Sequence, residues 1–186
     1  MDTYLVTPNN SITSTLTQLG GEHDPALHWR AERWKRFDSY PVPPETGKRR
    51  VVLLDITSQL RAKRSSEKNK LLVNSDIIVE TITSMGWKAS GVATLFGFML
   101  EHPEVVSTMP LRNGEQPYIW ACGSFVRLPR IIPLGHPKEG FKAYIKKSGQ
   151  WCMLGCATGT TPLSVEARSS HIELEVMNRL FLAEKA

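Results

Sequence analysis

Hydrophobic residues recur with helical spacing in the stretch that ends at Gly86. Ile78, Ile82 and Met85 are four and then three positions apart, which places them on one face of a 3.6-residue period. Asn74, or the serine after it, can accept hydrogen bonds from the first exposed N–H groups of such a helix. Gly86 can adopt the left-handed conformation that commonly follows a helix. The pattern therefore predicts an amphipathic helix between these two residues.

A second helix is predicted between Ser90 and Pro103. It ends before the proline, because proline disfavours helical backbone in the residue that precedes it. Apolar residues surround this helix on nearly all sides, and a helix of that kind is buried. These residues are Val92, Leu95, Phe96, Phe98, Met99 and Leu100. We expect the rest of the chain to pack against it.

Strands are predicted on both sides of the helical pair. Residues 51–60 alternate between apolar and polar positions in their second half, and residues 118–128 are rich in aromatic and branched side chains. Residues 141–147 and 150–157, joined by a Ser-Gly turn, predict a β-hairpin. Residues 171–176 alternate strictly, which predicts a strand followed by a short helical tail.

The first 47 residues differ from the rest in composition. They are polar, are interrupted by proline and glycine, and contain no lysine or arginine before Arg30. This composition is typical of an extended or disordered arm. We therefore predict an N-terminal arm over residues 1–47 and a globular domain over residues 48–186. The expected fold is α+β: a single compact domain in which a small antiparallel sheet packs against two or three helices.

Positive charge is concentrated in one part of the chain. The net charge is +5, yet residues 30–70 contain twelve basic and five acidic residues, so this window carries +7 and the remainder carries −2. A local basic excess is typical of a surface that contacts nucleic acid or acidic lipid. The basic residues of the window are Arg30, Arg33, Lys35, Arg36, Lys48, Arg49, Arg50, Arg61, Lys63, Arg64, Lys68 and Lys70.

The residue types give no indication of catalysis. The three cysteines, Cys122, Cys152 and Cys156, lack a second Cys or His pair at zinc spacing, so no metal site is predicted. The glycine-rich stretch at 155–160 lacks the lysine of a phosphate-binding loop, and no serine lies in a Gly-x-Ser-x-Gly turn. No acid, base or nucleophile is paired with a partner. We therefore expect no enzyme and no cofactor.

The segment after Pro103 has no clean period and carries apolar side chains between two prolines. It is predicted to be a loop. Loops that expose apolar residues commonly dock on a partner, although packing against their own domain is the alternative. The residues concerned are Val105, Val106, Met109, Pro110 and Leu111.

The next strand carries a family resemblance. It reads Gln-Pro-Tyr-Ile-Trp-Ala-Cys-Gly-Ser-Phe-Val-Arg-Leu-Pro from Gln116 to Pro129. In this spacing, the chain resembles the matrix proteins of rhabdoviruses, especially those of the vesiculovirus type. The shared pattern is a Gln-Pro before Tyr118, Cys122 four residues after that tyrosine, and a Leu-Pro after the cysteine. The order of the predicted elements agrees over residues 51–157.

This resemblance implies a viral structural protein that self-associates, lies beneath the envelope and on the inner face of host membranes, condenses the nucleocapsid and drives budding. By position, the apolar loop residues 105–111 match the self-association loop of the family. The chain lacks the family's lysine-rich N-terminal tail and its Pro-Pro-x-Tyr tract. Membrane and nucleocapsid contacts would therefore fall to the basic residues between Arg30 and Lys70.

A second class of function stays open at this point. A small basic protein can instead bind RNA or DNA, or inhibit a host factor, as an accessory protein. The expected partners are thus the chain itself, an anionic membrane surface and the viral nucleocapsid, or else RNA or host factors.

Overall fold

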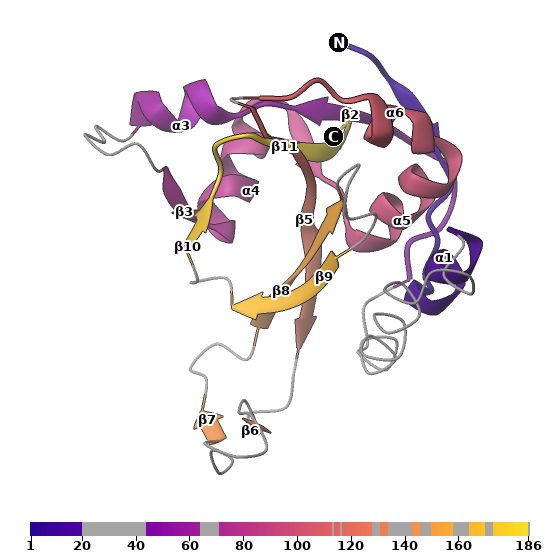
Figure 1. Ribbon diagram of the computed structural model, residues 1–186. Helices are drawn as coiled ribbons and strands as arrows, with labels where there is room; N and C mark the ends of the chain where they lie inside the picture. The colour runs from indigo at the N-terminus through magenta and orange to yellow at the C-terminus, as the bar shows by residue number, and fades with distance from the viewer. Residues whose placement is uncertain are drawn as a thin grey trace.

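The computed structural model describes residues 1–19, 44–63, 71–112, 114–115, 117–127, 131–133, 143–145, 150–157, 164–169 and 173–185. In these ranges, helices and strands combine in one α+β arrangement, with a central sheet between two groups of helices (Figure 1). The predicted α+β class is confirmed.

The main sheet has seven strands and mixed directions. Neighbouring strands run antiparallel except β11 and β5, which run parallel. The sheet is larger than the one predicted, because the last strand of the chain lies inside it. The strands in spatial order are β1 (Tyr4–Val6), β2 (Arg49–Leu54), β11 (Arg179–Lys185), β5 (Tyr118–Arg127), β8 (Gln150–Ala157) and β9 (Ser164–Ser169), and β4 (Trp87–Ala89) also pairs with β11.

Two further pairs of strands lie outside the main sheet. One is formed by β3 (Leu72–Asn74) and β10 (Glu173–Glu175), and the other by β6 (Ile131–Pro133) and β7 (Ala143–Ile145). Each has only three residues per strand.

Helices cover both sides of the sheet and divide the core in two. One group comprises α1 (Ile12–Gln18), α5 (Val92–Glu101) and α6 (Pro103–Thr108), and the other comprises α3 (Thr57–Lys63) and α4 (Ser75–Ser84) (Figure 1). Alternate residues of a strand point to opposite faces. Accordingly, Val51 and Leu182 pack with α5, whereas Val52 and Phe181 belong to the cluster that contains the buried residues of α4.

The two helices predicted from the hydrophobic pattern are confirmed. Asn74 caps α4, since its Oδ1 accepts a hydrogen bond from the Ile77 N–H at 2.9 Å. Gly86 follows this helix with a φ of 79°. In α5, every residue from Val92 to Met99 is buried, as its apolar surface predicts.

The N-terminus of α5 is capped by distant parts of the chain. Gly91 precedes the helix and has no side chain that can accept a hydrogen bond. The buried Ser124 Oγ on β5 instead accepts from the Val92 N–H at 2.9 Å. The Glu45 carboxylate accepts from the Thr94 hydroxyl. The Glu45 contact attaches the chain before β2 to the central helix.

The N-terminal nineteen residues belong to the packed domain, which differs from the predicted arm. β1 pairs with β2, and Val6 and Leu16 are fully buried against the α5 side of the sheet. The Thr7 N–H donates to the Glu101 carboxylate at 3.1 Å, and the Asn9 N–H donates to the Ala93 carbonyl at 2.9 Å. Short polar segments of this kind gain order from tertiary contacts that their composition does not reveal. The rest of the predicted arm, residues 20–43, lies outside the described residues.

Other local predictions need correction. The strand expected over 51–60 ends at Leu54, and the second half of that range begins helix α3 instead. Residues 103–108 form a short helix instead of a loop. Within the described residues, β7 pairs with β6, while β8 pairs with β5 and β9, so the expected hairpin is absent. The strand expected over 171–176 is present as β10, but the predicted helical tail is strand β11.

Candidate functional site

The apolar residues after Pro103 divide into a buried and an exposed set. Val106 and Met109 are 4% and 7% exposed and belong to the core beside α5. Val105 is half-buried against the same core, Pro110 is exposed, and Leu111 is 60% exposed. Only the end of the predicted self-association loop is therefore available to a partner in this conformation.

The exposed leucine lies on a segment that is fixed on both sides. Before it, Met109 anchors the chain in the core. After it, Arg112 and Glu115 exchange backbone hydrogen bonds of 2.8 and 3.0 Å around a turn in which Gly114 has a φ of 79°. The Arg112 side chain also forms an ion pair with Asp55 at 2.5 Å. Leu111 is thus held outward by its neighbours.

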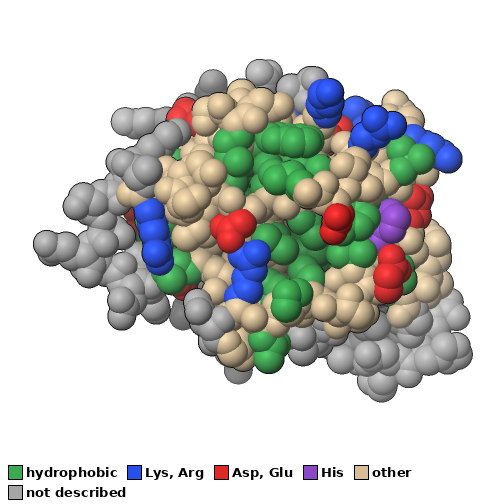
Figure 2. Space-filling view, turned by 90° about the horizontal axis from the view of Figure 1, so that it is seen from above, with side chains coloured by type: hydrophobic (Ala, Val, Ile, Leu, Met, Phe, Trp, Pro, Cys, Tyr) green, Lys and Arg blue, Asp and Glu red, His purple; other side chains and the backbone are tan. Residues whose placement is uncertain are grey.

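The segment that follows α6 runs across the upper side of the molecule in Figure 1. Figure 2 views the molecule from that side and shows hydrophobic side chains gathered near the middle of the face, with single acidic and basic side chains among them. An exposed apolar group in such surroundings is typical of a contact surface.

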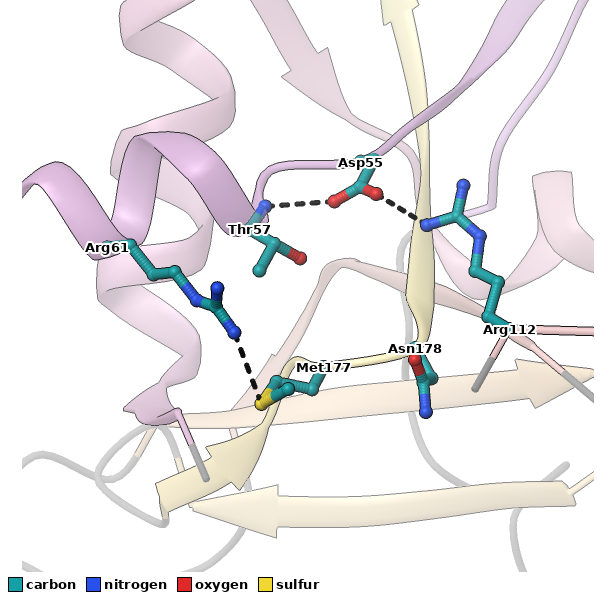
Figure 3. A pocket seen from close by; sticks show the side chains of 6 residues that line it. All are labelled: Asp55, Thr57, Arg61, Arg112, Met177 and Asn178. Carbon is teal, nitrogen blue, oxygen red and sulfur yellow. Dashed lines mark hydrogen bonds and ion pairs between the residues drawn. The ribbon is translucent and has the colours of Figure 1, made fainter. Parts of the chain in front are cut away.

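Beside Leu111, a polar pocket opens between three separate segments (Figure 3). Its volume is about 340 Å³. Its wall is formed by α3 and the residues just before it, by the turn around Arg112 and by the turn between β10 and β11. The lining residues are Asp55, Thr57, Arg61, Arg112, Met177 and Asn178.

Asp55 is the acidic group of this pocket and remains ionised. Its partial burial raises the pKa, but hydrogen bonds from Thr57 and Arg112, and the charge of Arg112, lower it further than burial raises it. The net effect is a pKa below the usual value of an aspartate. At neutral pH the carboxylate therefore holds the Arg112 guanidinium in place.

This pKa shift predicts a loss of stability in acid. A group whose pKa is lowered by folding stabilises the folded state above its unfolded pKa, and this contribution disappears as the pH falls through the folded pKa. We expect the difference in unfolding free energy between the unmodified chain and Asp55→Asn to be constant from neutral pH to about pH 5 and to shrink below about pH 4. The difference is small, because the Asp55 side chain is 43% exposed.

Urea unfolding of both chains across this pH range measures the effect. A difference that grows in acid would contradict the ionised Asp55–Arg112 pair. Glu80→Gln, on the exposed side of α4, serves as the control for removing one exposed carboxylate elsewhere.

The predicted basic residues are only partly brought together. Lys48 and Arg50 are exposed near the start of β2. Arg49 lies between them but forms an ion pair at 3.4 Å with Glu184, a buried residue of β11 that also pairs with Lys88. Arg49 therefore stabilises the sheet, while its two neighbours face solvent.

The other basic residues of the window are separated from this group or lie beyond what can be placed. Arg61 lines the pocket. Lys63 ends α3, and its side chain is outside the described residues. The remaining predicted residues, Arg30, Arg33, Lys35, Arg36, Arg64, Lys68 and Lys70, lie outside the described residues altogether.

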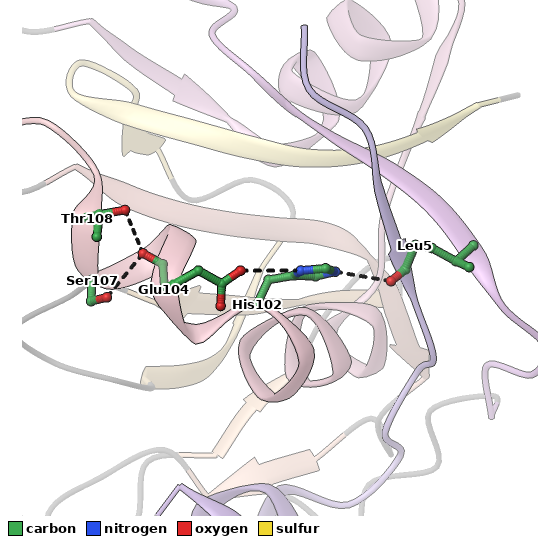
Figure 4. Close-up of polar contacts among 5 residues, drawn as sticks. All are labelled: Leu5, His102, Glu104, Ser107 and Thr108. Atoms are coloured by element: carbon green, nitrogen blue, oxygen red, sulfur yellow. Dashed lines mark hydrogen bonds and ion pairs between the residues drawn. The ribbon is translucent and has the colours of Figure 1, made fainter.

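A histidine links the N-terminal strand to the junction between α5 and α6 (Figure 4). The Nε2 atom of His102 lies 3.1 Å from the Leu5 carbonyl oxygen, and its Nδ1 atom lies 3.6 Å from Glu104. The ring also packs between Tyr4 and Phe98 at centroid distances of 5.2 and 5.5 Å. These contacts give His102 a structural role at the base of α6.

Among the described residues, no group of His, Cys, Asp and Glu side chains is arranged to hold a metal ion, and no helix is long and apolar enough to span a bilayer. Cys122 is buried in β5. The side chains of Cys152 and Cys156 lie outside the described residues.

Sequence reasoning missed the pocket. Asp55 and Arg112 are 57 positions apart, and neither the turn at Met177–Asn178 nor the start of α3 was predicted. The available signals were the turn residues beside the pocket, Asn113-Gly114 and Asn178, and the structure confirms positive φ angles at Gly114 and Asn178.

Comparison of the chain with protein-family models, with curated proteins and with solved structures finds no match in any of the three.

Proposed function

We propose that this chain is a viral matrix-type structural protein, which self-associates and coats anionic surfaces. It would act on the inner face of the membrane and on the nucleocapsid, promoting condensation and budding. The proposal rests on the family resemblance of residues 51–157 together with the surface described above, and it involves no catalysis.

The observation that supports self-association is the exposed Leu111. A leucine that is 60% exposed keeps most of its side chain in water, and burying it against a second copy would contribute about 1.5–3 kcal/mol. Because Met109 and the Arg112–Glu115 turn hold the segment in place, little conformational entropy is lost when it docks. A fixed apolar side chain is therefore well suited to join identical subunits.

Surface binding is supported by the position of Lys48 and Arg50. Both are exposed and neither forms an ion pair within the described residues. Near an acidic membrane each basic residue contributes about 1 kcal/mol, so a few of them give reversible binding that salt weakens.

Replacing Leu111 by serine is expected to raise the concentration needed for assembly by at least about tenfold, because a buried leucine contributes more than 1.4 kcal/mol. The stability of the isolated domain should change by less than about 0.5 kcal/mol, since the residue is on the surface. Light scattering over a concentration series and thermal unfolding measure the two effects.

Leu72→Ser is the matched control for this experiment. Leu72 is 41% exposed on β3, away from the loop, so the same chemical change there should leave assembly unaltered. Assembly of Leu111→Ser at the unmodified concentration would show that the loop does not join subunits. A chain that stays monomeric and binds RNA with a steep salt dependence would favour an accessory nucleic-acid-binding protein instead.

A further inference from the structure

Arg61 is one of the two arginines that line the pocket of Figure 3. Arg61 extends from α3, and one of its N–H groups lies 3.8 Å from the sulfur of Met177. A thioether is a weak acceptor, whereas a guanidinium has five N–H donors. Within the described residues Arg61 forms no ion pair. The contact with Met177 orients the guanidinium toward the pocket, and none of the described carboxylates pairs with it.

The opposite wall presents a second guanidinium in a fixed orientation. Arg112 is held by the carboxylate of Asp55 at 2.5 Å, and Asp55 is in turn held by the Thr57 N–H at 3.0 Å. Arg112 can donate through only some of its N–H groups to that carboxylate, so others are left for a ligand. The formal charges of the lining residues, two positive and one negative, leave the pocket with a net charge of +1.

We propose that this pocket binds a phosphate group, held between Arg61 and Arg112. Guanidinium forks match the oxygens of phosphate, and two of them on opposite walls suit a tetrahedral anion better than a cation or an apolar group. Asn178 completes the wall beside Met177. A volume of about 340 Å³ accommodates a phosphate together with a small polar group attached to it.

The phosphate can come from a soluble phosphate ester or from a lipid headgroup, and the chemistry is the same in both. The proposal does not depend on self-association, because the phosphate would contact Arg61 and Arg112, whereas the Leu111 side chain does not line the pocket. Leu111→Ser should therefore leave phosphate binding unchanged, so that failure of one proposal is distinguishable from failure of the other.

The test compares Arg61→Gln with Lys185→Gln. Both substitutions remove one positive charge from an exposed side chain, but Lys185 ends β11, does not line the pocket and is not one of the proposed surface-binding residues. The soluble probe is glycerol phosphate, and the methyl resonance of Met177 reports on binding, because its sulfur contacts Arg61. The lipid probe is a vesicle of phosphatidylcholine with phosphatidic acid. Circular dichroism checks that each variant is folded.

We expect glycerol phosphate to shift the Met177 resonance in the unmodified chain and in Lys185→Gln. Arg61→Gln should bind it at least about tenfold more weakly, because the substitution removes charge-assisted hydrogen bonds to the phosphate. A tenfold effect of Arg61→Gln on vesicles alone would instead identify the lipid headgroup as the source of the phosphate.

Three results would overturn the proposal. Equal weakening by the two substitutions, with either probe, would mean that only the general positive charge matters. Binding of succinate as tightly as glycerol phosphate would show that the pocket does not select phosphate. Absence of any binding that depends on Arg61 would remove the site.

Discussion

Replacing Gly97 by alanine is expected to destabilise the protein and release its N-terminal segment. In α5, a Cβ at position 97 would lie 2.0 Å from the Thr7 carbonyl oxygen and 2.9 Å from the Val6 side chain. The first of these neighbours is backbone and cannot rotate away, so the segment that carries β1 must move. Overpacking of this kind costs about 1–3 kcal/mol.

The sign of the change in unfolding free energy is informative, because replacing glycine by alanine in the interior of a helix normally stabilises a protein by about 0.5–1 kcal/mol. Urea unfolding measures the loss, and hydrogen exchange at the amides of Tyr4–Val6 shows whether β1 has separated from β2. A more stable Gly97→Ala chain with unchanged exchange in β1 would contradict the close packing of residues 1–19 on α5.

Gly114→Ala is the control for this substitution. Nothing lies within 4 Å of a Cβ at position 114, so its cost arises only from the positive φ of 79°. The exchange of the β1 amides should therefore remain unchanged in that variant, even where its stability falls.

Replacing Phe181 by alanine is expected to cost about 3–5 kcal/mol, the usual range for a buried phenylalanine. Phe181 is 1% exposed on β11, opposite Leu54 of β2 and Trp120 of β5. Its ring fills the core on the α4 side of the sheet, so its removal leaves a cavity beneath the middle of the main sheet. A loss of this size is a large part of the stability of a typical domain.

Leu180→Ala is the matched control. Leu180 is the preceding residue of the same strand but is only half-buried, at the edge of the core on the α5 side. We expect it to cost clearly less than Phe181→Ala in urea unfolding. Equal losses at the two positions, or a small loss at Phe181, would contradict the placement of β11 between β2 and β5.

The sequence predicted those elements whose signals are local. α4 is specified by Asn74, an apolar face and Gly86, all within thirteen residues, and α5 by apolar residues on every side. Strand β5 was predicted for the same reason, from a continuous run of aromatic and branched residues. Each of these patterns follows from the geometry of its own element.

The C-terminal strand was mispredicted because its local preference opposes its environment. Residues 179–185, Arg-Leu-Phe-Leu-Ala-Glu-Lys, are mostly good helix formers. In the folded chain they lie between β2 on one side and β5 and β4 on the other, and burial on both faces overrides that preference. Glu184 is accommodated there by ion pairs with Arg49 and Lys88, which no local pattern indicates.

The candidate site, like β11, depends on tertiary packing, so the sequence predicted only part of it. The apolar stretch after Pro103 was predicted to dock on a partner or to pack against its own domain. Which of its residues face the core depends on α6 packing beside α5. That packing buries Val106 and Met109 and leaves Leu111 outside. The pocket arises from side chains on three distant segments and has no signature within any one of them.

The central claim is that this chain acts by binding copies of itself and anionic surfaces. Sedimentation of the unmodified chain over a wide concentration range, alone and with acidic or neutral vesicles, tests it most directly. The account predicts assemblies that grow with concentration and co-sedimentation with acidic vesicles that declines as salt is added. A chain that remains monomeric at every concentration and ignores acidic vesicles would contradict it.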